Sequence, residues 1–130
     1  MLHPYAFPKT YSLKSRKRIG QLFKKGRVVK VYPLKLIYLS QPKQDNQQAL
    51  RVLMSVSKRR FALAVDRNTL KRRCREAFRL NKNTLEHTLV QHGTYADIAV
   101  LYVGSTFYPF EDINKAMQSG LERISKELSK

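Results

Sequence analysis

The chain has little of what builds disulfide scaffolds, metal clusters or membrane spans. It contains one cysteine among its 130 residues, and no tryptophan. A single cysteine excludes an internal disulfide framework and any all-cysteine metal site, and it is compatible with a reducing compartment. No apolar run approaches the roughly 20 residues that a membrane-spanning helix requires, and the first residues lack the apolar segment of a signal peptide. We therefore expect a protein of the cytoplasm that has no membrane partner.

Acidic side chains are also scarce. Nine Asp and Glu residues stand against 26 Lys and Arg residues, which gives a formal net charge of +17. Solubility needs far less charge than that, so the excess implies a polyanionic partner. With 42% hydrophobic residues, the length suits one globular domain with one core. We expect a single nucleic-acid-binding domain over residues 1–130, in which residues 1–12 are extended because Pro4 and Pro8 disfavour a helix there.

The side chains that would cleave a nucleic acid without help do not gather on any predicted element. Such chemistry needs a general acid and base, or clustered carboxylates that hold metal ions. No D-x-D, D-x-E or H-x-x-x-H spacing occurs on a clear helix or strand, and the adjacent acids Glu111 and Asp112 fit the start of a helix for dipole reasons. His87 and His92 do not share a helix face, and Cys74 falls on an apolar stripe. We predict no catalytic residue and no metal site in the chain.

The chain is organised around Arg67–Arg79, which predicts a helix with two distinct faces. The apolar stripe consists of Leu70, Cys74, Ala77 and Phe78. The cationic face consists of Arg67, Lys71, Arg75 and Arg79, with Asn68 and Arg72 beside them. Asp66 is the expected N-cap, and Asn81 and Asn83 would close the helix. An ordinary solvated face is the alternative, but charge of one sign with few internal partners favours binding of a nucleic acid.

The first half of the chain predicts one helix and a pair of strands. Ser15 and Gly26 bracket the helix, and the segment from Lys14 to Lys30 holds eight basic residues and no acid. Val28–Leu39 predicts a strand with Pro33 at an edge or a bulge. Alternation would place Tyr32, Leu34, Leu36 and Tyr38 on one face and Lys35, Ile37 and Leu39 on the other. The polar segment Ser40–Gln48 would join this strand, as a long hairpin, to a return strand over Leu50–Ser57.

The second half predicts a buried strand between two helices. Glu86–Tyr95 is interpreted as a helix end and a loop, and Asp97–Val103 as a strand buried on both faces. The spacing of Ile113, Met117, Leu121, Ile124 and Leu128 indicates a closing amphipathic helix. The order is helix, two or three strands, helix, strand, helix. We therefore expect an α+β fold (αβββαβα-like) with helices packed on one mixed sheet.

The central stretch also carries a recognisable signature. The pattern R-N-x-x-K-R-x-x-R-E resembles that of the protein component of bacterial ribonuclease P, and is supplied here by Arg67, Asn68, Lys71, Arg72, Arg75 and Glu76. Upstream, Val56–Arg59 resembles the V-S-K-[KR] stretch of the family, and F-P-K, L-K and L-F-K-K-G within residues 7–26 resemble its N-terminal portion. The resemblance spans about residues 7–128, with its specificity in 51–79. One departure is the linker 60–65, which is one residue longer than the commonest family form and lacks its usual glycine.

The resemblance implies a left-handed β-α-β crossover and a division of labour. In the family, the RNA subunit holds the active site and its magnesium ions, and the protein binds that RNA and the 5′ leader of precursor tRNA. This chain would then be the protein component of an endoribonuclease that removes the leader, with no active site of its own and no cofactor bound by the protein alone. Its partners would be ribonuclease P RNA and precursor tRNA, without an obligate protein partner.

The family's binding residues can be matched to positions of this sequence. Arg67, Asn68, Lys71, Arg72 and Arg75 would lie near the catalytic RNA core, flanked by Lys58, Arg59, Arg60 and Arg79. The leader cleft, between the first helix and the sheet, would be lined by Ile19, Phe23, Tyr38 and Ser55. At Ile19 the family often has an aromatic residue, so one stacking contact would be absent. Without the resemblance, Phe23 and Tyr38 could equally be core residues.

Two other classes of protein share some of these features. A ribosomal or other structural RNA-binding protein would have the charge and the α+β fold, but no reason to carry the signature. A small independent endoribonuclease would need the acid–base constellation that the sequence does not show.

Overall fold

The computed structural model of the protein describes residues 11–43 and 48–130, so most of the expected extended segment 1–12 lies outside the described residues. The described residues form four helices and four strands. In chain order they are α1 (Arg16–Lys25), β1 (Arg27–Val31), β2 (Leu34–Pro42), β3 (Leu50–Val56), α2 (Ala64–Asn81), α3 (Asn83–Gln91), β4 (Thr94–Tyr102) and α4 (Phe110–Leu128). The expected α+β architecture with one mixed sheet is confirmed.

The strands form one sheet in the order β1-β2-β4-β3. The β1–β2 and β2–β4 pairs are antiparallel, whereas β3 runs parallel to β4. The predicted long hairpin between the strands on either side of Ser40–Gln48 is therefore wrong, because β4 lies between β2 and β3. Pairing of strands far apart in sequence decides this order, and no local pattern reports it.

The stretch predicted as one strand over Val28–Leu39 is two strands. The chain reverses at Tyr32–Pro33, and Val31 pairs with Leu34 across the turn. Proline has no backbone N–H to give to a strand ladder, so its place is a turn between two strands rather than a bulge within one. The real hairpin of this fold is thus β1–β2.

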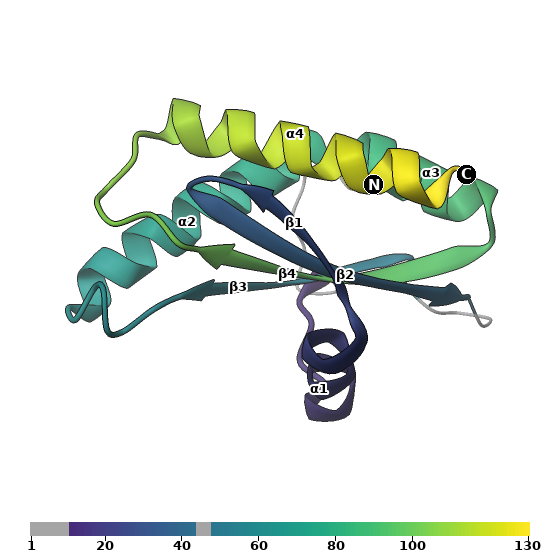
Figure 1. The fold of residues 1–130 in the computed structure, drawn as a ribbon, viewed down its shortest axis with the longest axis horizontal. Coiled ribbons are helices and arrows are strands. Elements are labelled where there is room, and N and C mark those ends of the chain that lie inside the picture. The colour runs from purple at the N-terminus through teal and green to yellow at the C-terminus, as the bar shows by residue number, and fades with distance from the viewer. Residues whose placement is uncertain (1–10, 44–47) are drawn as a thin grey trace, which may run out of the picture.

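The two faces of the sheet are covered unequally (Figure 1). On one face, α2, α3 and α4 bury the main core, to which the sheet contributes Leu36, Ile98 and Val100. On the other face, α1 lies alone and packs Leu22 against Ile37 and Ala99. The strand β4 is buried from both sides, as its near-continuous apolar run predicted. Beyond α1, the second face has no helix among the described residues.

A crossover connects the parallel strands β3 and β4 through α2 and α3. Both strands point the same way in Figure 1, with β3 on the far side of β4, and the helices return along the α4 side of the sheet. This path is left-handed, as the family resemblance implied. The segment interpreted as a helix end and a loop, Glu86–Tyr95, does hold the end of a helix, a turn and the start of β4, but that helix is the separate α3, whose buried Leu85 and Leu89 repeat one helical turn apart. α2 ends at Asn81, as predicted, but Lys82 keeps a helical backbone and a second helix, α3, begins at once at Asn83.

The helix ends also differ in part from expectation. Ser15 caps α1 as predicted, its Oγ accepting from the backbone N–H of Arg18 at 3.3 Å. Gly26 ends α1 with a φ of −69°, so it is needed for close approach rather than for a left-handed backbone. A Cβ there would lie 2.4 Å from the Leu22 carbonyl oxygen and 2.6 Å from Ile37. Asp66 is not the N-cap of α2, which begins at Ala64, but lies in its first turn.

None of the helices in the described residues is long and apolar enough to span a bilayer.

Candidate nucleic-acid interface

The helix α2 is oriented by its apolar stripe. All four stripe residues are buried against the main core, as predicted: Leu70, Cys74, Ala77 and Phe78. This packing turns the signature residues outward, with Asn68, Arg72 and Arg75 exposed and Lys71 half-buried. We call Asn68, Lys71, Arg72 and Arg75 the signature face. Within the described part of the chain, no ion pair occupies its three cations.

The signature face borders a hollow at the outer edge of β3, the last strand of the sheet. Asn68, Lys71 and Arg75 line it from the helix, and Ser12 and Leu13 line it from the N-terminal segment. That segment is tied to the strand edge, because the Leu13 N–H donates to the Val52 carbonyl oxygen at 2.9 Å. The hollow has a volume of about 290 Å³ and is open to solvent. A polar and cationic rim beside this strand is suited to a phosphate backbone.

Two predicted RNA-binding arginines already have protein partners. Arg67 donates from Nη1 to the carbonyl oxygens of Phe61 and Ala62, each at 2.8 Å, and so fixes the linker that leads into α2. Arg79 forms a two-pronged pair with Glu76, and this hydrogen bond lowers the pKa of Glu76. Both guanidiniums keep exposed surface, but each has a structural task in the free protein.

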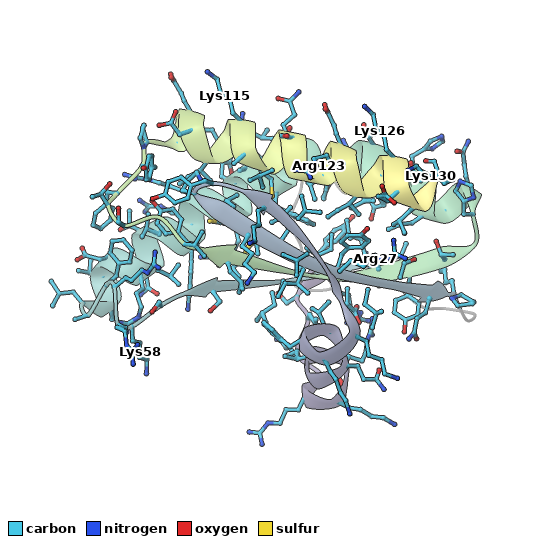
Figure 2. The ribbon with its side chains drawn as sticks, in the orientation of Figure 1. Arg27, Lys58, Lys115, Arg123, Lys126 and Lys130 are labelled. Atoms are coloured by element: carbon cyan, nitrogen blue, oxygen red, sulfur yellow. The ribbon has the colours of Figure 1, made fainter. Side chains whose placement is uncertain are left out.

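The basic residues of the turn before α2 are likewise of two kinds, some exposed and one engaged with the protein backbone. Lys58 and Arg59 are exposed, and Figure 2 shows Lys58 pointing away from the body of the protein. Arg60 instead donates to the carbonyl oxygen of Val103 and ties the turn to the end of β4. The linker that departs from the family pattern is anchored by Phe61, which is buried with its ring 5.8 Å from that of Tyr102. Phe61 therefore anchors the linker 60–65 to the core just before α2.

The expected leader cleft is brought together only in part. Ile19 packs against the small core under α1, and Phe23 beside it is 47% exposed. Ser55 lies on the same face of the sheet, one alternation from Leu53 of that core. Tyr38 does not belong there: it is buried in the main core, on the opposite face of the sheet. The predicted alternation along β2 is correct, but α1 covers the Ile37 face, so β2 offers Lys35 and Leu39 to this side instead.

A buried ion pair fixes α1 over the sheet, and sequence reasoning missed it. Arg18 donates from Nε to Oδ2 of Asp97 at 3.0 Å, and its guanidinium lies 4.9 Å from the centre of the Tyr95 ring. Asp97 is almost fully buried in β4. A carboxylate in an apolar run was the available signal, because a buried charge requires a partner. The pair positions α1, and with it Phe23.

The groups considered for catalysis are dispersed. The described residues contain no group of three His, Cys, Asp or Glu side chains placed to hold a metal ion. Burial raises the pKa of the Cys74 thiol to about 12, so the thiolate that a nucleophile requires is disfavoured. His87 lies on α3 and His92 just after it, while Glu111 and Asp112 occupy the first turn of α4. These residues do not form an acid–base pair.

Comparisons with known proteins agree on one family. The family model described as Ribonuclease P matches residues 7–125. The ribonuclease P protein component of Porphyromonas gingivalis is 36% identical over 121 residues, covering 93% of this chain and 88% of the relative. That of Chlorobium phaeobacteroides is 36% identical over 132 residues, covering 95% and 90%.

Solved structures show the same fold. The RNase P protein of Staphylococcus aureus superposes with a TM-score of 0.67 at 23% identity, covering 88% of this chain and 94% of that one. The RNase P protein of Thermotoga maritima gives 0.65 at 21% identity, covering 86% and 96%. On the strength of the family match and the two relatives, this chain belongs to the family of ribonuclease P protein components.

Proposed function

We propose that this chain is the RNA-binding subunit of a cytoplasmic ribonuclease P ribonucleoprotein, in which it binds the catalytic RNA and the 5′ leader of precursor tRNA. Membership of the family makes it a protein component of a tRNA-processing endoribonuclease. The observation that carries the proposal is the signature face. Three cations without an ion pair in the described chain project from a helix whose other side is buried. Such a face is stabilised when phosphates approach it, because condensed counterions are then released.

The α1 side of the sheet supports binding of the single-stranded leader. Single-stranded RNA is held by stacking of bases on aromatic rings together with a cationic track. Phe23 offers an exposed ring on α1, while Lys35 and Ser55 offer polar groups on the uncovered part of the same sheet face. The leader would run along this face, between α1 and the signature face, and reach the cleavage site held by the RNA.

Cleavage itself is assigned to the RNA subunit. The protein's described residues present neither an acid–base pair nor a carboxylate cluster, and the thiol of Cys74 is buried. In the holoenzyme, magnesium ions held by the RNA would neutralise charge developing on the scissile phosphate. The protein's task is then to bind, orient and retain substrate and RNA.

One assay separates this function from its two alternatives. Precursor tRNA is incubated at low magnesium with bacterial ribonuclease P RNA, with this protein, and with both. Stimulated cleavage only in the complete mixture supports the proposal. Cleavage by the protein alone supports an independent endoribonuclease, and no stimulation in any mixture supports a structural RNA-binding protein.

A matched pair of variants links the assay to the signature face. Replacing Lys71 and Arg75 by Gln removes two charges from that face, whereas replacing Lys43 and Lys115 by Gln removes two charges elsewhere on the surface. The first variant should lose most of the stimulation at moderate salt, and the second should retain it. Equal losses would show that total charge alone matters.

A further inference from the structure

A second cationic hollow lies on the α4 side of the sheet, far from the signature face. It opens between the edge strand β1 and the C-terminal half of α4, with a volume of about 430 Å³. We call it the α4 groove, and its lining residues are Arg27, Val28, Val29, Tyr38, Arg123, Lys126, Glu127 and Lys130. Figure 2 shows Arg123, Lys126 and Lys130 along the C-terminal part of α4 and its end, Arg27 on the sheet below them, and Lys115 toward the other end of α4.

The charge of the groove is only partly neutralised by the protein. Four of its lining residues are cationic and one is acidic. Glu127 is shared, lying 3.2 Å from Lys130 and 3.9 Å from Arg27. Arg123 reaches across the groove and donates to the backbone carbonyl oxygen of Lys30 at 3.4 Å, while Lys126 has no ion pair within the described chain. A net excess of positive charge therefore remains in a concave surface, where its field is concentrated.

Tyr38 adds a neutral donor to the same surface. Its ring is buried in the main core, only 4% exposed, and it also lines an adjoining hollow with Lys25 and Ser40. No hydrogen bond between described residues occupies its hydroxyl group. A phenolic O–H among several cations is a combination that suits a phosphate oxygen, because hydrogen bonds to charged acceptors are the strong ones.

The position of the groove makes it independent of the signature face. The strand β1 is one edge of the sheet, whereas the signature face lies beside β3 at the opposite edge. The groove is also on the face of the sheet that α1 does not cover. A single short segment of RNA cannot occupy both sites without wrapping around the domain.

We propose that the α4 groove binds the phosphate backbone of a structured, helical segment of the ribonuclease P RNA. The inference rests on the proposed function, to which it adds a second contact surface. Helical RNA is recognised through its backbone and shape, whereas single strands require exposed rings for stacking. The only aromatic ring that lines the groove within the described chain, that of Tyr38, is buried in the core. The groove thus suits a duplex and not the leader.

The test compares two charge-matched double variants for binding of bacterial ribonuclease P RNA across a salt series. Arg123→Gln with Lys126→Gln removes two cations from the groove, and Lys43→Gln with Lys115→Gln removes two from elsewhere. Each phosphate contact contributes about 0.7–0.9 to the slope of log affinity against log salt, so the groove variant should lose about one to two units of slope. Its affinity should fall about tenfold, while the control stays near wild type and both keep their melting temperatures.

Tyr38→Phe tests the neutral donor without changing charge. It should weaken RNA binding by about ten- to hundredfold, since a hydrogen bond to a charged group is lost while the ring still fills the core. The ratio of affinities for precursor and mature tRNA in the holoenzyme should not change in any groove variant.

Three results would overturn the inference. Equal slope losses in the two double variants would show that the groove contributes only through the total charge of the protein and is not a specific contact site. A groove variant with wild-type binding, beside a Lys71→Ala variant that loses slope, would reject the groove and leave the proposed function standing. A fall in the precursor-to-mature ratio would assign the groove to the leader. Failure of the wild-type protein to bind the RNA would instead reject the proposed function itself.

Discussion

Neighbouring residues on α1 differ sharply in their exposure to solvent. Leu22 is fully buried, whereas Phe23, the next residue, keeps nearly half of its surface in solvent. A large aromatic side chain gains little stability in that position, and it lies beside a polar, uncovered part of the sheet. This exposure argues against Phe23 as a core residue. An accessible ring is also what stacking with a base requires.

Phe23→Ala should weaken binding of precursor tRNA to the holoenzyme by about 1–2 kcal/mol, the contribution of one stacked base. Binding of mature tRNA, which has no leader, should be nearly unchanged. The two affinities, measured with the same preparation, give the result directly.

Leu22→Ala provides the contrasting control, since truncation of a buried leucine costs about 2–5 kcal/mol of stability. It should lower the melting temperature and weaken both interactions together. If Phe23→Ala behaved in the same way, the ring would be a packing residue and the cleft assignment would be wrong.

Cys74 makes the stability of the protein sensitive to alkaline pH. Burial raises the pKa of its thiol from 9.0 to about 12, so the folded protein keeps a proton that the unfolded chain releases. Stability is therefore highest below about pH 9 and is lost as the pH rises toward the folded pKa. The loss approaches about 1.4 kcal/mol per pH unit within that window.

Cys74→Ala should remove this slope. Other groups titrate in the same range, so the quantity to compare is the difference in free energy of unfolding between the two proteins across about pH 8 to 10.5, a span that brackets the unfolded thiol pKa. The difference should narrow as the pH rises. A constant difference would mean that the thiol is more accessible to water than its burial indicates.

At the scale of elements, α2 could be predicted from the sequence and the sheet could not. The stripe and the cationic face of α2 are set by residues within four positions of each other, so a local pattern was enough to predict both. By contrast, the place of β4 between β2 and β3 depends on strands that are distant in sequence. The missed helix α3 is an intermediate case, since Leu85 and Leu89 gave a signal that Asn81 and Asn83 obscured.

Tyr38 shows which part of a site cannot be predicted locally. Its alternation with Lys35, Ile37 and Leu39 was correct, because strand geometry fixes which residues share a face. Which face α1 would cover is decided by Leu22 meeting Ile37 and by Arg18 meeting Asp97, across the fold. For the signature residues, local spacing was enough to predict that they share a face, because all of them lie on one helix.

Two glycines at α1 should respond oppositely to alanine. A Cβ added at Gly20 would have no neighbouring atom within 4 Å, so Gly20→Ala should raise the free energy of unfolding by about 1 kcal/mol through helix propensity alone. At Gly26 the added carbon meets the backbone oxygen of Leu22, which cannot move aside cheaply. Gly26→Ala should therefore cost about 1–3 kcal/mol. Chemical denaturation measures both, and a stabilised Gly26→Ala protein would contradict the close packing of α1 on β2.

At the scale of the whole molecule, the charge is distributed over separated surfaces. The signature face lies beside β3, the basic block from Lys14 to Lys30 runs through α1 and β1, and the α4 groove lies at the β1 edge. Only four ion pairs between described residues offset the positive charge. A domain with this distribution can lie between RNA segments, so its binding should report the sum of several independent phosphate contacts.

The affinity for ribonuclease P RNA should accordingly fall steeply and linearly on a plot of log affinity against log salt. Replacing Lys71, Arg72 or Arg75 by Ala should reduce the slope by about one unit or less each, because each side chain contributes at most one phosphate contact. The fold should be unaffected, since none of the three has an ion-pair partner to lose among the described residues, and Lys115→Ala supplies a control on another helix. Combining Arg72→Ala with Arg123→Gln should reduce the slope by the sum of the single effects, because the two sites lie at opposite edges of the sheet. An unchanged slope in all three signature variants would contradict the signature face as the main RNA-binding surface and would point to the block from Lys14 to Lys30 instead.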